Sequence, residues 1–151
     1  MAWVIFSKFV ESLLDGSTSV NLDTGGDTLQ LAFLDATLAP DPTHDGDEFW
    51  DDIVVNEVTG TGYTTGGQTL DSQLVSMADG TLTFDVADEV FSQNAAGFSD
   101  ARYAILWKDT TVDSTSPLIA YADLGGDKSV VSGDLTIEMD AAGVFTVGLA
   151  T

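Results

Sequence analysis

The sequence predicts a mainly β protein, an antiparallel β-sandwich or jelly roll of about eight strands preceded by a short N-terminal helix or arm. Three observations lead to this fold class. Short apolar runs follow one another at near-regular spacing, Gly- and Asp-containing turns separate them, and only the start of the chain has a helical period. Because 151 residues suffice for one continuous core, we expect a single domain over residues 1–151.

The first fourteen residues carry apolar side chains at three-to-four-residue spacing, which predicts a short helix or arm over residues 1–15 that ends near Asp15-Gly16. The apolar positions are Trp3, Phe6, Phe9, Val10, Leu13 and Leu14. Such a face needs a partner, which by default is the sheet of the same chain and alternatively a neighbouring subunit.

From Thr28 to Asp35 the period changes to two, which predicts the first strand. A polar segment with two prolines follows from Ala39 to Glu48 and leads to a group of large apolar residues. Further strands are expected over Thr69–Met77 and Thr81–Val86, with Phe84 and Val86 facing inward. The Asp-Gly pair between these two strands is a strong signal for a hairpin.

Four glycines surround Tyr63 in the segment between Glu57 and Leu70, at positions 60, 62, 66 and 67. Glycine allows positive φ without a Cβ penalty, so this segment predicts two successive turns or bulges. A phosphate-binding loop would continue into a helix or a Lys-Ser/Thr pair. Here Gln68-Thr69-Leu70 leads into another strand-like run, so we interpret the segment as structural.

The most hydrophobic strands are expected at Ala101–Lys108 and Pro117–Leu124, in the centre of the fold. Gly125-Gly126-Asp127-Lys128 is expected to turn the chain. Two further strands follow over Asp134–Met139 and Val144–Leu149. The aromatic residues Tyr63, Tyr103, Trp107 and Tyr121 are assigned to packing.

Acidic residues dominate the charge, with 25 Asp and Glu against four Lys and Arg and a net charge of -21. A surface of this kind repels phosphate backbones and anionic lipid, so we expect neither nucleic acid nor membrane as a partner. It favours a solubilising coat, and docking on a basic surface or binding a cation are the alternatives. No signal peptide is evident, and no apolar run is long enough to span a membrane.

The inventory of reactive side chains offers little for catalysis. Cysteine is absent and His44 is the only histidine, so thiol chemistry and transition-metal sites are not expected, and we predict no cofactor and no metal. His44 lies in a Pro-Thr-His-Asp-Gly loop that a polar turn explains. The many carboxylates would still permit glycoside hydrolysis, although the sequence does not indicate which two acids would act.

The sharpest cation candidate is the acidic segment from Asp41 to Asp52, which places oxygen ligands and Gly46 at spacings found in calcium loops. It departs from that pattern at several positions. Phe49 stands where a ligand is usual, Asp52 replaces a bidentate Glu, and prolines deny the preceding helix. A solvated acidic loop is therefore the simpler interpretation.

Several segments in order along the chain resemble a family of small virion proteins of tailed bacteriophages. They are Asp27-Thr-Leu-Gln-Leu-Ala-Phe-Leu, Thr43-His-Asp with Trp50-Asp-Asp, Asn56-Glu-Val with Gly60-Thr-Gly-Tyr-Thr-Thr-Gly-Gly, Ala101-Arg-Tyr-Ala, Pro117-Leu-Ile-Ala-Tyr-Ala-Asp-Leu-Gly, and Gly133-Asp-Leu-Thr-Ile. The resemblance implies a non-enzymatic decoration or cement protein on the capsid surface of the virion, made in the host cytoplasm. Its implied partners are the major capsid protein and itself, as a homotrimer.

The interface residues expected from the sequence are the large or acidic groups with no evident place in a sandwich core: Trp3, Phe6, Phe9, Asp45, Asp47 and Trp50. Two other functions stay in view. A tail or fibre module that binds host surface glycan predicts exposed aromatics clustered at one end of the fold. A glycosidase requires two acids that face each other in a cleft.

Overall fold

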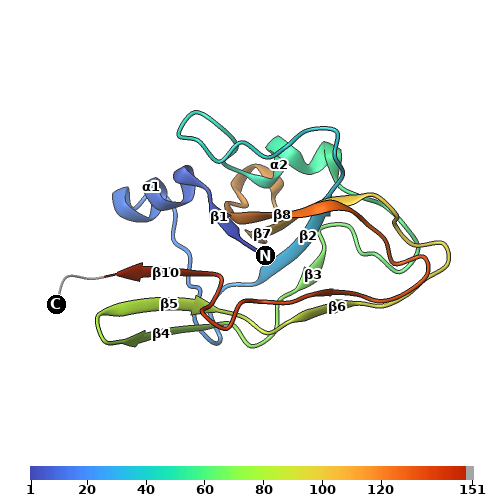
Figure 1. The fold of residues 1–151 in the computed structure, drawn as a ribbon. Coiled ribbons are helices and arrows are strands. Elements are labelled where there is room, and N and C mark those ends of the chain that lie inside the picture. Colours follow the sequence, from blue (N-terminus) through green and yellow to red (C-terminus); the bar gives the residue numbers. More distant parts are fainter. Residues whose placement is uncertain (149–151) are drawn as a thin grey trace.

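A computed structural model describes residues 1–148, and its fold is mainly β with antiparallel sheets and a short N-terminal helix, as the sequence predicts (Figure 1). The strands are β1 (Trp3–Ile5), β2 (Leu29–Leu34), β3 (Gln68–Thr69), β4 (Leu74–Ala78), β5 (Thr81–Asp85), β6 (Glu89–Phe91), β7 (Ala101–Lys108), β8 (Leu118–Lys128), β9 (Leu135–Ile137) and β10 (Phe145–Gly148). The helices are α1 (Ser7–Asp15) and α2 (Trp50–Ile53), with 3-10 turns η1 (Val54–Asn56) and η2 (Asp113–Thr115). No helix within residues 1–148 is long and apolar enough to cross a membrane.

The strands form a five-stranded sheet in the order β1-β8-β7-β2-β3, a three-stranded sheet β10-β5-β4 and a two-stranded sheet β6-β9. The prediction that the two most hydrophobic strands are central is confirmed, because β8 and β7 lie inside the large sheet. Figure 1 shows α1 and α2 on one side of this sheet and the two smaller sheets on the other.

The large sheet is buried on both faces. On one face Phe33 of β2 packs against Phe91 and Phe98, with ring centroids 4.5 and 5.3 Å apart. On the other face Trp107 of β7 stacks on Trp50 of α2, with centroids 4.6 Å apart and planes within 5°. The predicted in-and-out alternation along β2 is therefore incomplete, since Ala32 and Leu34 are as buried as their neighbours.

The N-terminal segment is a strand followed by a helix, which corrects the prediction of one helix from Trp3 onward. Trp3 pairs with Ala122 of β8 at the edge of the large sheet. The helix begins at Ser7 and ends at Gly16, whose φ of 76° gives the left-handed cap expected at this position. Phe6 and Phe9 are buried in the core, so the default expectation of packing within the same chain is confirmed.

The glycine pair after Leu124 interrupts a strand and does not turn the chain, contrary to the sequence prediction. Strand β8 continues to Lys128, but its register with β7 shifts between the pairs Tyr103 to Asp123 and Ala101 to Lys128. The surplus residues of β8 form a bulge, for which Gly125 supplies a φ of 74°.

The predicted strand over Thr69–Met77 is two strands in different sheets. Strand β3 pairs with β2 and β4 pairs with β5, and the chain crosses between the sheets at Ser72, which has a φ of 54°. The predicted hairpin is confirmed: Asp79 and Gly80 both have positive φ, as a two-residue type I′ turn requires. Phe84 and Val86 face inward as expected.

The four-glycine segment lies directly against β2, and this contact yields a stability prediction. Gly67 has a φ of 95°, and a Cβ there would overlap the carbonyl oxygen of Leu31. We expect Gly67→Ala to lower the free energy of unfolding by about 2 kcal/mol or more, through strain and displacement of β2. The control is Gly133→Ala, where a Cβ meets open space. Equal melting temperatures for the two variants would contradict this account.

Candidate interaction surface

The two segments that the sequence predicts as an interface lie in contact, although more than thirty residues separate them in the chain. The amide of Ser7 donates to the carbonyl of Pro42 at 3.0 Å. His44 Nδ1 lies 3.4 Å from Glu11 Oε2. We call the exposed side chains of α1 together with residues 41–48 the α1–loop surface.

The aromatic residues predicted for this interface lie mostly beneath it. The premise that they have no place in the core is wrong for Phe6, Phe9 and Trp50, which are all buried. Phe6 packs on Tyr121 with ring centroids 5.7 Å apart. Trp3 is half-buried at the sheet edge. The buried side chains hold α1 and the loop on the core, and they are not exposed for contact with a partner.

The acidic members of the prediction have different environments. Asp45 is exposed at the tip of the loop, whereas Asp47 is half-buried. Burial raises the pKa of Asp47 above its ordinary value. Whether either residue contacts a partner stays a prediction.

Helix α1 leaves an apolar flank exposed, which sequence reasoning did not distinguish from its buried face. Phe9 and Ser12 face the core, and the Ser12 hydroxyl donates to the carbonyl of Phe9 at 3.0 Å. Val10, Leu13 and Leu14 remain in solvent, and Leu14 is 84% exposed. The apolar stripe of the helix is thus wider than the strip that the core covers. Ser12 lies on the buried side of the helix, so its place among the apolar residues was the sequence signal that the buried and exposed sides differ.

Acidic groups lie along the side of α1 that adjoins residues 41–48. Lys8 Nζ forms an ion pair with Glu11 Oε2 at 3.2 Å. That hydrogen bond is the main reason why the pKa of Lys8 is raised, and the charges of Glu48 and Asp45 add to it. The single cation on the helix is therefore held by acids, and the rim of the α1–loop surface is negative.

The loop of residues 41–47 is closed by hydrogen bonds among its own backbone and carboxylate groups. The Asp41 amide donates to Asp47 Oδ2 at 2.7 Å, and the Asp47 amide donates to the Asp41 carbonyl at 2.9 Å. The Thr43 amide donates to Asp41 Oδ1 at 3.0 Å. These bonds with Thr43 lower the pKa of Asp41.

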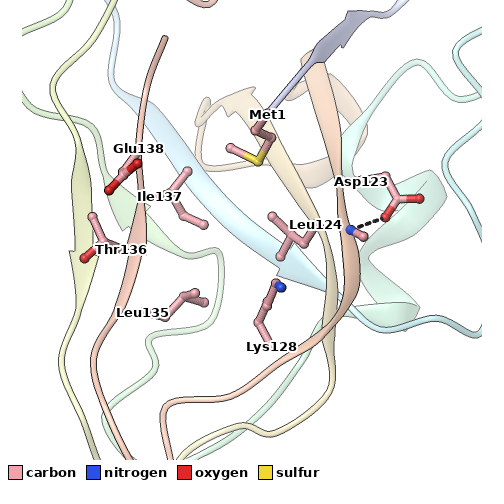
Figure 2. Close-up of a pocket in the computed structure, with 9 residues that line it drawn as sticks. Met1, Asp123, Leu124, Lys128, Leu135, Thr136, Ile137 and Glu138 are labelled. Atoms are coloured by element: carbon pink, nitrogen blue, oxygen red, sulfur yellow. Dashed lines mark hydrogen bonds between the residues drawn. The ribbon is translucent and has the colours of Figure 1, made fainter.

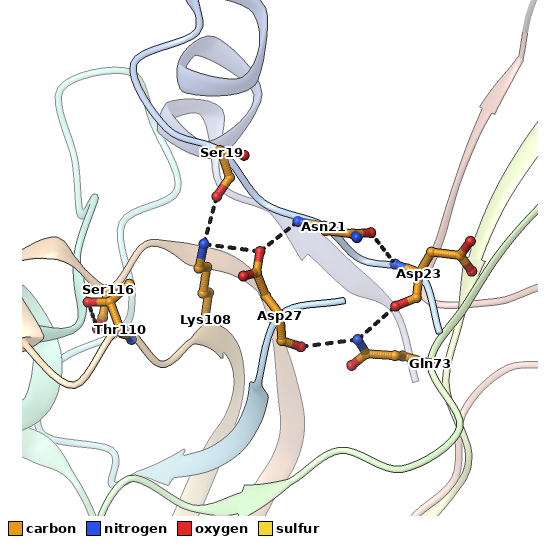
Figure 3. Close-up of polar contacts among 8 residues, drawn as sticks. All are labelled: Ser19, Asn21, Asp23, Asp27, Gln73, Lys108, Thr110 and Ser116. Carbon is orange, nitrogen blue, oxygen red and sulfur yellow. Dashed lines mark hydrogen bonds and ion pairs between the residues drawn. The ribbon is translucent and has the colours of Figure 1, made fainter. Parts of the chain in front are cut away.

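Residues 21–27 repeat the same closed loop, which sequence reasoning missed. The Asn21 amide donates to Asp27 Oδ2 at 2.7 Å, and the Asp23 amide donates to Asn21 Oδ1 at 3.1 Å (Figure 3). Gly26 and Gly46 occupy equivalent positions, since a Cβ on either would overlap the carbonyl oxygen of the first loop residue. The shared pattern, an Asx followed five residues later by Gly-Asp, was present in the sequence.

The first loop is fastened to the large sheet by Lys108 of β7. Its ammonium group lies 3.0 Å from Asp27 Oδ2 and donates to the carbonyl of Ser19 at 2.7 Å (Figure 3). Burial alone would raise the pKa of Asp27, but the bonds from Asn21 and Lys108 lower it below its ordinary value.

The calcium-like spacing after Asp41 does not assemble a cluster of ligands. Among residues 1–148 no three His, Asp or Glu side chains are grouped so that they could hold a metal ion. Asp41 and Asp47 accept backbone amides, and Asp52 Oδ2 accepts the amides of Glu48 and Phe49 at the start of α2.

Two of the buried or half-buried acids, Glu57 and Glu89, are engaged with structural partners. Glu57 Oε1 accepts the Tyr63 hydroxyl at 2.9 Å and the Gly66 amide at 2.6 Å. Glu89 accepts the side-chain amide of Gln68 and the amide of Asp71. Neither acid lines the cavities of about 450 and 210 Å³ that adjoin the glycine segment. These two acids are therefore not placed as the facing pair that a glycosidase requires.

A third cavity, of about 340 Å³, lies between β8 and β9 beside the glycine bulge (Figure 2). Leu124, Leu135 and Ile137 point into it, and Lys128 extends between them. Glu138 points away, and Asp123 accepts the Gly125 amide at 2.7 Å. The cavity is thus mainly apolar and does not bring two carboxylates together.

The glycan-binding alternative depends on exposed aromatic rings. No Phe, Tyr or Trp in the part of the chain that the structure describes is more than partly exposed, and the strongly exposed apolar side chains there are Met, Val and Leu.

No family model, curated protein or solved structure matches the chain.

The buried Glu57 yields a prediction about pH. Burial raises the pKa of Glu57, so the folded state holds this proton more tightly than the unfolded state, and stability from this group is lost as the pH rises through the raised pKa. Because both hydrogen bonds reach one oxygen, Glu57→Gln keeps them without the buried charge. We expect the melting temperature of the variant relative to wild type to increase as the pH rises from about 4.3, the ordinary Glu value, towards neutral.

Thermal scans of the two proteins across this pH range measure that difference directly. Glu138→Gln, at an exposed acid directly after β9, serves as the control for removing one negative charge. A constant difference between Glu57→Gln and wild type would contradict the account.

Proposed function

We propose that this protein is a bacteriophage capsid decoration, or cement, protein that binds the outside of the major capsid shell and stabilises it. The resemblance of the sequence to small virion proteins supports this function. The observation that carries it is the α1–loop surface, an exposed apolar flank with an acidic rim. An apolar groove with basic side chains around it would complement that surface.

The charge distribution supports docking on a basic partner. Three of the four basic side chains form ion pairs with acids of the same chain: Lys8 with Glu11, Arg102 with Asp123, and Lys108 with Asp27. Most of the 25 acidic residues are therefore left without a counter-charge, and the net charge is -21. Such a field steers the protein to a positively charged shell and keeps it soluble before assembly.

The finer fold class belongs to the same proposal. We infer a sandwich in which the large sheet is one layer and the three- and two-stranded sheets together form the second. Phe84 of β5, Phe91 of β6 and Ile137 of β9 belong to one apolar core with the large sheet, which supports that arrangement.

The function is tested by Leu14→Asp, which places a carboxylate in the centre of the apolar flank. Undecorated expanded capsids of the phage that encodes the chain are incubated with each protein and sedimented. We expect wild type to bind stoichiometrically and raise the melting temperature of the shell. The variant should bind about tenfold more weakly or worse, because a buried unpaired charge costs more than the 1.4 kcal/mol that corresponds to tenfold.

The matched control is Val55→Asp, since Val55 is also 84% exposed and lies in η1, directly after α2 and outside the α1–loop surface. It should bind like wild type. Failure of wild-type protein to bind the shell would overturn the proposed function. Equal loss in both variants would overturn the assignment of the surface.

A further inference from the structure

Strand β10 forms an edge of the three-stranded sheet, and within residues 1–148 it carries none of the features that usually protect an edge. Its residues, Phe145 to Gly148, are uncharged, and the sequence has no charged residue after Asp140. Natural edge strands are commonly guarded by charges, prolines or covering loops, because their unpaired backbone groups bind other strands.

The hydrogen-bonding direction along β10 follows from the hairpin. In a two-residue hairpin the residues that flank the turn, Ala78 and Thr81, bond to each other. Leu82 and Phe84 of β5 therefore direct their backbone groups to β10, where they meet Val147 and Phe145. Thr146 and Gly148 then direct their N–H and C=O groups outward. Within residues 1–148 no backbone group of another segment bonds to them.

The opposite edge of the same sheet, strand β4, is protected by side chains of another segment. At β4 the Val75 amide donates to Asp23 Oδ1 at 3.1 Å, and the Thr24 hydroxyl donates to the Gln73 carbonyl at 2.7 Å. The loop of residues 21–27 thus places a carboxylate and a hydroxyl on that edge. The edges of the large sheet are β1 and β3, which are only three and two residues long.

One face of this sheet carries exposed apolar side chains as far as β10. Met77, Leu82 and Val147 are neighbours across the sheet and lie on the same face as Phe84, which is buried. Met77 is 63% and Val147 46% exposed. The core-facing side of this sheet therefore continues past the core of the chain, towards the edge of β10.

We propose that the edge of β10 pairs with the same edge of a second copy of this chain, antiparallel and about a two-fold axis. In this register Thr146 lies opposite the partner's Gly148, and Val147 lies opposite the partner's Val147. Each outward N–H then meets an outward C=O, and the two three-stranded sheets become one sheet of six strands.

Charge favours a second copy as the occupant. Two molecules of net charge -21 repel each other over most of their surfaces, so copies can approach only where acids are absent. The β10 edge meets this condition, and its exposed groups complement themselves under a two-fold operation. The contact is isologous and closes at two copies, so it is separate from the proposed binding to the shell. A homotrimer would need a different contact.

The backbone of Thr146 provides a direct test. Thr146→Pro removes the outward N–H without removing a hydrogen bond of the folded monomer, and proline is tolerated on edge strands. Thr146→Ala keeps the N–H and is the matched control. We expect sedimentation equilibrium to show a wild-type dimer, a dissociation constant at least about tenfold higher for the proline variant, and little change for the alanine variant.

A second variant acts through a side chain, so the test does not depend on how proline is accommodated. Val147→Lys places like charges directly opposite each other in the dimer but leaves the side chain in solvent in the monomer, and it should also yield monomers. Added salt should strengthen the wild-type dimer by screening the acidic repulsion. A monomeric wild type, or equal dissociation constants for the proline and alanine variants, would overturn the proposal.

Discussion

The five-stranded sheet is buried on both faces, and most other features of the fold depend on covering it. The stack of Trp107 on Trp50 illustrates the constraint, because it requires α2 to lie across β7. The acidic loop of residues 41–48, which precedes α2, must then end beside β7. Phe6 and Phe9 cover the sheet next to it and so fix the position of α1. The α1–loop surface is therefore a consequence of how one face of the sheet is closed.

On the other face Phe91 of β6 and Phe98 pack on the sheet, and small residues make this close packing feasible. Ala104 of β7 pairs with Ala122 of β8 and with Phe33 of β2, and all three are fully buried. The methyl side chains leave room for Phe91 and Phe98 above Phe33. Larger residues at these positions would force the layers apart.

A chain this acidic must also limit the repulsion between its own carboxylates, and local hydrogen bonds are the means visible in the structure. Six aspartates accept the amide two residues further along the chain: Asp15, Asp35, Asp41, Asp109, Asp123 and Asp140. This arrangement ties each charge to a turn and compensates part of its cost. It lowers the pKa of Asp15 and Asp41. The pKa of Asp123 is lowered mainly by the hydrogen bonds from Arg102, and the Gly125 amide adds to that effect. The contribution of these three groups to stability therefore exists above the ordinary Asp range and is lost on acidification.

Sequence patterns were sufficient where the signal is local. The strand over β2, the Asp79-Gly80 hairpin and the end of the helix near Gly16 depend on neighbouring residues, and each was predicted correctly. Patterns failed where tertiary contacts decide. The bulge at Gly125 depends on the register with β7, and the burial of Trp50 depends on Trp107, 57 positions away in the printed numbering. The contact between α1 and the acidic loop is of the same non-local kind.

The two surfaces proposed for binding differ in electrostatics, and this difference separates their roles. The α1–loop surface has an acidic rim, so added salt should weaken its attraction to a basic partner. The β10 edge carries no charge, and added salt there relieves repulsion between two acidic molecules. Figure 1 shows α1 and β10 as separate elements, with α1 above and β10 below the edge of the large sheet. A dimer joined through β10 would present two α1–loop surfaces, and binding both to one shell would increase avidity without any new contact, provided that their spacing matches the sites.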